Sequence, residues 1–192
     1  VENVSPTLFD GLALWLDAND TGDVAGEWKD KSGRLRHAVA NGSPDLISNG
    51  FNGLPVMRYS GNNAGTGRDY HDFGKIGNVR TVFWVWKNSG GWYFMLGDRD
   101  NSHFHRQSYM FDSTWASSRV KEGTLRLNGS LVSTTSTPFQ NQMSIIALRT
   151  TGDVSATYFS KDRTGTMIDS PMGILASWSY TTSRSAIPKC PS

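Results

Sequence analysis

Cysteine is nearly absent from the 192 residues, because only Cys190 occurs, close to the end of the chain. An intrachain disulfide is therefore excluded, and the core and the sheet hydrogen bonds must hold the fold. Long apolar runs are also missing, so no segment is predicted to cross a bilayer. The first residues lack the hydrophobic stretch of a signal peptide, and we expect a mature protein or a domain excised from a larger one.

Strong net charge is missing as well, since 19 basic and 17 acidic side chains leave a formal charge of +2. Nothing in this balance requires a nucleic acid or an anionic membrane as partner. Glutamate is scarce, with Glu2, Glu27 and Glu122 scattered along the chain. A retaining glycosidase needs two carboxylates about 5 Å apart, and no expected strand carries acidic residues at alternate positions. A Gly-x-Ser-x-Gly motif is absent too, so we expect a protein that is not an enzyme.

The sequence is instead rich in residues typical of β-sheets and tight turns, including seven tryptophans and twenty glycines. Apolar residues alternate or form short blocks separated by Gly, Pro, Asn and Ser, which predicts strands and no helix. The expected strands are 13–17, 37–40, 55–60, 80–87, 92–97, 102–107, 124–127, 143–149, 155–160 and 172–180. The nearly continuous apolar runs 81–86 and 143–148 should be central strands. Turns are expected at 88–91, 128–130 and 151–153, with Asn128-Gly129 closing a hairpin.

The opening of the chain joins an apolar strand to a polar turn that contains glycine. Residues 11–20 read Gly-Leu-Ala-Leu-Trp-Leu-Asp-Ala-Asn-Asp, and residues 28–33 read Trp-Lys-Asp-Lys-Ser-Gly. Together with residues 52–61, this order resembles the opening of bacterial laminin-G-like domains of the concanavalin A-like lectin/glucanase superfamily. The resemblance implies an all-β fold, an antiparallel β-sandwich of jelly-roll type, as a single domain over residues 1–192 with an irregular tail at 181–192.

The resemblance also implies a role. We expect a non-enzymatic, lectin-like module of a bacterial cell-surface or pilus adhesin, extracellular and part of a larger surface protein, that binds a glycan on a host or neighbouring cell. Nucleic-acid binding and membrane insertion are not expected. The alternatives are a calcium-assisted peptide-binding adhesin domain, a structural spacer and a degenerate glycoside hydrolase. In the family the opening residues are chiefly structural, which here concerns Trp15, Asp17, Trp28, Asp30 and Gly33.

The densest collection of ligand-binding residue types lies between residues 92 and 119. Aromatic rings stack on the apolar faces of sugars, while Asp, Asn, His and Arg bond to hydroxyl groups. Arg106 could pair with an anionic sugar, a peptide carboxylate or Asp112. A shift of register by one residue would exchange each contact for its core-facing neighbour. The expected ligand contacts are Trp92, Asp98, Arg99, Asp100, Asn101, His103, His105, Arg106, Trp115 and Arg119.

Metal binding is a separate question. Asp98, Asp100 and Asn101 offer enough oxygen atoms for part of a Ca²⁺ site, and the alternative is a charged turn with Arg99 between the acids. No cofactor is required by the sequence, and Ca²⁺ stays open. His103 and His105 would share one face of a strand, a spacing that can bind transition metals, although no third ligand is evident. Residues 17–23 only superficially match a calcium loop.

Overall fold

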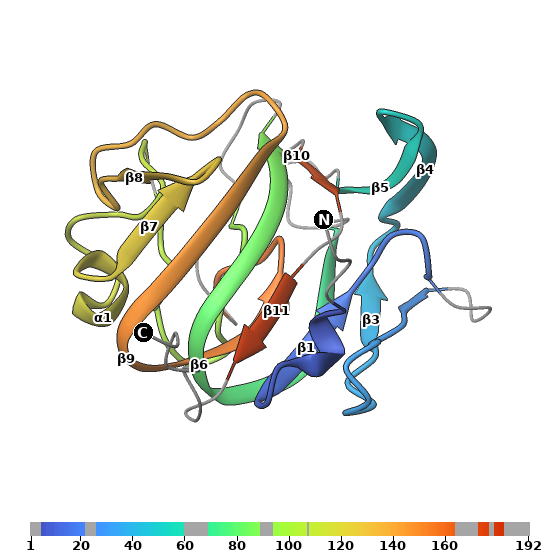
Figure 1. Ribbon diagram of the computed structural model, residues 1–192, viewed down its shortest axis with the longest axis horizontal. Helices are drawn as coiled ribbons and strands as arrows, with labels where there is room; N and C mark the ends of the chain where they lie inside the picture. The colour runs from blue at the N-terminus through green and yellow to red at the C-terminus, as the bar shows by residue number, and fades with distance from the viewer. Residues whose placement is uncertain are drawn as a thin grey trace, which may run out of the picture.

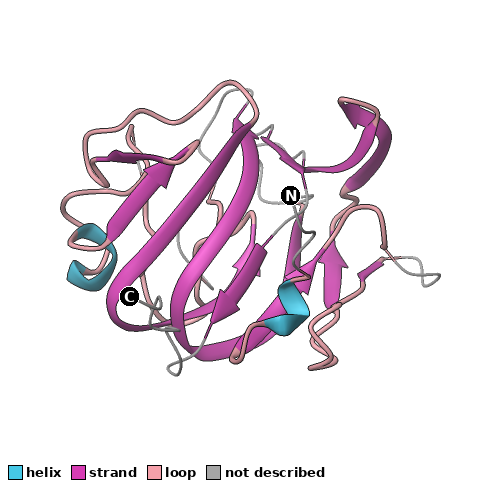
Figure 2. Cartoon of the chain, in the orientation of Figure 1, coloured by secondary structure: helices cyan, strands magenta, loops and turns pink. Residues whose placement is uncertain are grey.

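The computed structural model describes residues 5–21, 26–59, 69–88, 94–106, 108–163, 173–176 and 179–182. Strands dominate these ranges (Figure 2). The helical segments are a 3-10 turn at Pro6–Leu8 and the short helix α1 at Ser118–Lys121. The prediction of an all-β chain is therefore confirmed at the level of fold class. Within the described residues, no helix has the length and apolarity needed to span a membrane.

The strands pair antiparallel wherever their register is defined. They form one connected sheet with the order β4-β5-β10-β6-β9-β7-β8, and β11 and β3 pair with β6 while β1 and β2 pair with β11 and β3. The strands are β1 Leu12–Leu16, β2 Glu27–Trp28, β3 Ala38–Asn41, β4 Asp45–Phe51, β5 Leu54–Tyr59, β6 Tyr70–Asn88, β7 Thr124–Leu127, β8 Ser130–Val132, β9 Ser144–Phe159, β10 Gly173–Ala176 and β11 Ser179–Thr182.

The two longest strands, β6 and β9, lie side by side at the centre and curve strongly (Figure 1). Trp84 faces Ile146 and Val82 faces Leu148 across the pair. All four of these side chains are buried. The pairing register shifts at several points between residues 72 and 81, as at β-bulges, and such shifts bend a strand. The prediction that both apolar runs are central strands is thus confirmed.

Aromatic rings fill much of the core beneath these strands. Trp28, Tyr59, Trp84, Trp86 and Phe159 are all buried. Removing a large apolar side chain from water contributes about 2 kcal/mol or more to stability. Because the described part of the chain contains no disulfide, this aromatic interior and the sheet ladder stabilise the fold together.

Most of the expected strands are present. The expected strands 13–17, 37–40, 55–60, 80–87, 124–127 and 143–149 overlap β1, β3, β5, β6, β7 and β9. The Asn128-Gly129 hairpin between β7 and β8 is also confirmed, with φ angles of 49° and 85°. These values lie in the left-handed region that a tight two-residue hairpin requires.

Other local expectations are wrong. The expected turn at 151–153 lies inside β9, which continues to Phe159 and absorbs the expected strand 155–160. Residues 102–106 form no strand, because a turn at 103–104 interrupts the expected strand 102–107. Residues 94–97 make only an isolated bridge, from Gly97.

The C-terminal part also departs from expectation. Within the expected strand 172–180, the described residues 173–176 and 179–180 are in strands, β10 and the start of β11, and residues 172, 177 and 178 lie outside the described residues. The irregular tail was expected from residue 181, whereas β11 ends at Thr182. Residues 183–192, which include Cys190, lie outside the described residues. The sequence prediction missed β2 and β4, which are short or carry few apolar residues, whereas β8 is the second strand of the expected Asn128-Gly129 hairpin.

Candidate ligand-binding site

The opening turn is built around the buried carboxylate of Asp30. Its Oδ1 accepts hydrogen bonds from the backbone N–H of Trp15 at 3.0 Å and of Ser32 at 2.8 Å. Its Oδ2 accepts from the backbone N–H of Arg36 at 3.0 Å. Trp28 is 1 % exposed, and the φ angle of Gly33 is 80°. These contacts fix β1 against the turn, so the residues expected to be structural do serve the architecture.

The segment after residue 96 presses against the end of β9. Gly97 forms a bridge with Tyr158, and its N–H donates to the Tyr158 carbonyl at 2.9 Å. A Cβ atom at Gly97 would collide with the backbone carbonyl oxygens of Lys161 and Asp162. Glycine is therefore required here by the close approach of two backbones. The consequence is that Asp98, the next residue, points into the protein.

Asp98 is completely buried and fully engaged within the chain. Its Oδ2 accepts hydrogen bonds from Asn101 Nδ2 and Ser155 Oγ, both at 2.7 Å. Its Oδ1 accepts from Thr157 Oγ1 at 3.2 Å. Burial raises the pKa of Asp98, but the hydrogen bonds from Asn101 and Ser155, helped by the charge of Lys75, outweigh it, so the pKa lies below its ordinary value.

A lysine from β6 completes this cluster. The Nζ atom of Lys75 lies 2.5 Å from Asp100 Oδ2 and 4.0 Å from Asp98 Oδ1. The hydrogen bond to Asp100 raises the pKa of Lys75. The three expected calcium ligands are therefore adjacent, with an ammonium group beside both carboxylates. Among the described residues, no group of three or more His, Cys, Asp or Glu side chains is arranged to hold a metal.

Arg99 is exposed, yet it is committed to partners within the chain. Its Nε donates to the Tyr158 hydroxyl at 3.1 Å. Its Nη2 lies 3.2 Å from Asp72 Oδ2. The hydrogen bond to the Tyr158 hydroxyl is the largest influence that raises the pKa of Arg99, and the negative charge of Asp72 adds to it. Arg99 therefore ties the loop to β6 and β9.

The two histidines lie in different surroundings. His105 is buried, with Nδ1 3.1 Å from Asp162 Oδ2. His103 is half-buried, and burial lowers its pKa, with Asp98 opposing and Arg119 adding to the shift. Arg106 is buried too, with its guanidinium 3.7 Å from the centre of the Phe139 ring. His105 and Arg106 thus contribute to the interior, and an external ligand would have to displace these contacts to reach them.

Trp115 is the most exposed large hydrophobic side chain among the described residues of this region, with 56 % of it exposed. Its backbone is fixed on both sides: its N–H donates to Asp112 Oδ1 at 2.6 Å, and its carbonyl accepts from Ser102 Oγ at 2.8 Å. The His105 ring packs edge-on, 6.5 Å away between ring centres. A large aromatic ring is thus held at the surface by a rigid turn.

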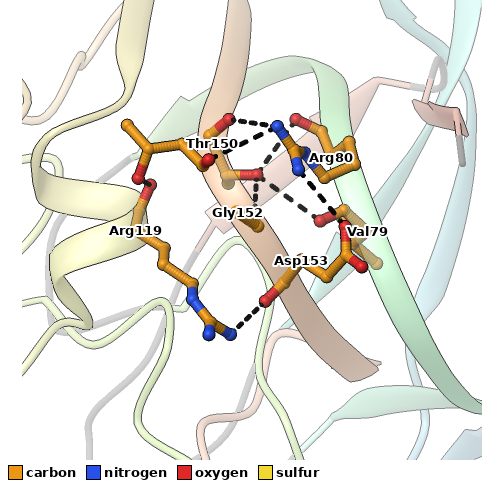
Figure 3. Close-up of polar contacts among 7 residues, drawn as sticks. Val79, Arg80, Arg119, Thr150, Gly152 and Asp153 are labelled. Carbon is orange, nitrogen blue, oxygen red and sulfur yellow. Dashed lines mark hydrogen bonds and ion pairs between the residues drawn. The ribbon is translucent and has the colours of Figure 1, made fainter. Parts of the chain in front are cut away.

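Arg119 lies on α1 and reaches back to the bend in β9 (Figure 3). Its Nη1 donates to the Asp153 carbonyl at 2.6 Å, and its side chain crosses Gly152 closely enough that a Cβ there would touch it at 3.0 Å. Arg80 holds the same bend from β6, with Nη2 on the carbonyls of Thr150 and Thr151. The guanidinium of Arg119 is therefore positioned at the surface.

The expected ligand contacts differ in how accessible they are. Trp92 lies outside the described residues. Asp98, His105 and Arg106 are buried, while Arg99, Asp100, Asn101, Trp115 and Arg119 are exposed and His103 is half-buried.

Sequence reasoning missed Lys75, Ser155 and Thr157, which reach Asp98 from distant strands. It also missed the role of Asp112, although an Asp that begins a turn two or three residues before its hydrogen-bond donors is a readable signal. Comparison with protein-family models, curated proteins and solved structures found no match to this chain.

Proposed function

We propose that this protein is a non-enzymatic carbohydrate-binding module with a lectin-like jelly-roll β-sandwich fold. The observation that carries the proposal is Trp115, an indole ring exposed to solvent on a turn whose backbone is fixed from both sides. An extracellular setting, as part of a surface or pilus adhesin that attaches to a glycan on another cell, is proposed from the resemblance of the opening residues.

An exposed tryptophan is suited to stacking on a sugar ring. Indole offers a large apolar face, and the C–H groups of a pyranose present a matching apolar face. The ring is exposed on an ordered turn, so its face is available to a ligand, which supports the proposal. Because the turn is already ordered, binding loses little conformational entropy.

Polar groups needed to bond the hydroxyls of a sugar are close by in the chain. Ser102, whose hydroxyl holds the Trp115 carbonyl, directly follows Asp100 and Asn101. Asp100 and Asn101 are both exposed. Carboxylate and amide groups pair well with vicinal hydroxyls. Together, Trp115 and these groups have the composition of a small carbohydrate site.

The test is a glycan-array screen of the purified chain, followed by affinity measurements on any sugar that binds. Trp115→Ala should reduce affinity by about tenfold or more, because it removes the stacking surface. The matched control is Leu131→Ala, which truncates another exposed apolar side chain, 67 % exposed on β8, and should bind normally. A blank array, or equal binding by wild type and Trp115→Ala, would reject the proposal.

A further inference from the structure

A hollow of about 340 Å³ lies where the β4–β5 hairpin approaches the end of β6 and the start of β9 (Figure 1). Its volume falls within the range of about 300–1,000 Å³ that is usual for small-molecule sites. The apolar side chains among the described lining residues are Phe51, Leu54, Pro55, Val85, Met143 and Ile145. Neither the Trp115 turn nor the Asp98 cluster contributes a described lining residue. The hollow is therefore separate from the candidate carbohydrate site.

Sheet pairing fixes one part of the lining. Val85 on β6 and Ile145 on β9 are paired across the two central strands. Asn128, in the turn between β7 and β8, is bonded to the same isoleucine twice. Its N–H donates to the Ile145 carbonyl, and its Oδ1 accepts the Ile145 N–H, both at 2.8 Å. These contacts hold the three residues side by side.

The β4–β5 hairpin supplies another part of the lining. Phe51 is paired with Leu54 across the turn Asn52-Gly53, whose φ angles of 49° and 78° suit a tight two-residue hairpin. Phe51, Leu54 and Ile145 are all exposed. Single exposed apolar side chains are common on proteins, but these three border one hollow. A molecule that fills the hollow would remove their apolar surface from water, which favours binding.

The polar part of the lining carries no charge. Three asparagines and Ser144 supply it, and no described lining residue is Asp, Glu, Lys, Arg or His. The carboxylate bonded to the Asn19 amide, that of Asp17, is paired with Lys31 at 3.2 Å. A charged ligand would lose its hydration in the hollow without gaining a counter-ion, which is costly. The lining therefore favours a neutral ligand.

Asn128 can give a bound molecule a fixed orientation. Because its Oδ1 accepts the Ile145 N–H, the fold sets the orientation of the amide group. The amide nitrogen carries two N–H groups, and none of the hydrogen bonds found among the described residues uses them. A carbonyl or hydroxyl oxygen on the ligand is a suitable acceptor for them.

The size of the hollow suits a small molecule better than a protein. Ten described residues line it, whereas each side of a standard protein–protein interface has about 20–30 residues. We propose that this hollow is a second binding site, which takes a small neutral molecule with an apolar body and a carbonyl or hydroxyl group at one edge. The apolar body packs against Phe51, Leu54 and Ile145, and the edge oxygen accepts a hydrogen bond from Asn128. This inference does not depend on the proposed carbohydrate-binding function.

The experiment titrates the whole chain with two fluorescent probes that share one ring system. Prodan is a neutral naphthalene ketone, whereas 6-dimethylamino-2-naphthoate carries a carboxylate in place of the ketone. Prodan should bind with saturation at one molecule per chain, and its emission should shift to shorter wavelength as it leaves water. The naphthoate should bind at least about tenfold more weakly, because its charge finds no counter-ion in the hollow.

Variants of the lining locate the probe. Ile145→Lys places an ammonium group at the hollow and should weaken prodan binding about tenfold or more. The matched control is Val39→Lys, because Val39 is also a β-branched strand residue, 54 % exposed against 56 % for Ile145, but does not line the hollow. Asn128→Asp keeps the acceptor for the Ile145 N–H but removes the donor, and should weaken binding several-fold. Circular dichroism establishes that each variant is folded, and Asn128→Asp decides the location if Ile145→Lys is not.

The outcomes separate this site from the Trp115 site. Absence of saturable prodan binding, or equal binding of the two probes, would overturn the inference. Prodan binding that survives both Ile145→Lys and Asn128→Asp, or that is lost in Trp115→Ala or Val39→Lys, would overturn it too, because the probe would then lie elsewhere. A dimer in sedimentation velocity that Ile145→Lys dissociates would assign the hollow to an interface between copies instead. A blank glycan array would reject the carbohydrate proposal alone and leave this one standing.

Discussion

Two buried aspartates organise two parts of this molecule in different ways. Asp30 accepts hydrogen bonds mainly from backbone N–H groups of residues close to it in the turn, with Trp15 the most distant. Among the described residues, the hydrogen bonds that Asp98 accepts come from side chains, those of Asn101, Ser155 and Thr157. The first carboxylate therefore shapes a local turn, whereas the second joins segments that are far apart in sequence.

This difference has consequences for function as well as folding. Backbone donors are present whatever the neighbouring side chains are, so the opening turn depends chiefly on Asp30 itself. The Asp98 cluster depends on several side chains at once, and it anchors the loop that leads to Ser102 and the Trp115 turn. The Asp30 contacts therefore hold the opening turn, while the Asp98 cluster holds the loop of the candidate site.

The largest effect is expected from Asp98→Ala. The change leaves the buried hydroxyls of Ser155 and Thr157 without their acceptor and should lower the free energy of unfolding by about 4 kcal/mol. Asp98→Asn should cost less because one oxygen remains as an acceptor. Urea denaturation measures both. A loss under about 1 kcal/mol for Asp98→Ala would show that the cluster does not support the loop.

The second largest effect is expected from acidification, which should lower the free energy of unfolding through a buried histidine beside the opening turn. His71 is buried against Trp28 and bonded to the Tyr59 hydroxyl at 2.8 Å. Burial lowers its pKa to about 4, with Asp69 opposing. The folded state therefore keeps the imidazole neutral where the unfolded chain binds a proton. Stability from this group is complete above pH 6.5 and should fall by about 3 kcal/mol as pH drops to about 4.

Unfolding midpoints measured across this pH range test the assignment. The slope should flatten in His71→Gln, after allowance for the lower stability of that variant at neutral pH. An unchanged slope would assign the acid sensitivity to other groups.

Two glycine substitutions compare the backbone of the opening turn, at Gly33, with that of the Asp98 loop, at Gly97. Gly97→Ala forces a methyl group against the carbonyls of Lys161 and Asp162 and should cost about 2 kcal/mol. Gly33→Ala meets no atom within 4 Å, so only its φ of 80° opposes it, at about 1 kcal/mol. Thermal unfolding of the two variants gives the order. The reverse order would contradict the close approach seen at Gly97.

The smallest effect is expected from Lys75→Gln, because the ammonium is 44 % exposed and Asp98 keeps its three hydrogen bonds. The pKa of Asp98 should rise, since one of the influences that lower it is removed. Stability from Asp98 is present above its unfolded pKa and is lost as pH falls through its lowered folded pKa, so acid unfolding should begin at a slightly higher pH. Carboxyl NMR titration reports the pKa directly. If the substitution leaves the pKa of Asp98 unchanged, Lys75 does not interact with the Asp98 carboxylate.

The fold was predictable where local pattern decides structure. Alternation and apolar runs located β6, β7 and β9, and Asn128-Gly129 located its hairpin, because these signals lie within a few residues of one another. β9 was predicted as two strands because Gly152 looked like a turn, whereas Arg80 and Arg119 brace the strand through that point. Those braces come from distant residues and leave no local signal.

The site was predictable in composition rather than in arrangement. The region 92–119 was singled out for its ligand-binding residue types, and in the structure it contains the exposed Trp115 and the hydrogen-bonded group around Asp98, while its binding role stays a prediction. Its expected alternation at His103 and His105 was wrong, since turns held by Ser102 and Asp112 replace a strand. Burial of His105 and Arg106 depends on Asp162 and Phe139, which lie far along the sequence. Such contacts follow only from the tertiary fold.

The most direct test measures sugar binding and stability on the same preparation of Trp115→Ala. If the Trp115 ring binds sugar and the turn is held by Ser102 and Asp112, affinity for the sugar found on the array should fall about tenfold or more. The free energy of unfolding should change by less than about 0.5 kcal/mol. Retained affinity, or a loss of stability of several kcal/mol that accounts for the lost binding, would contradict the account.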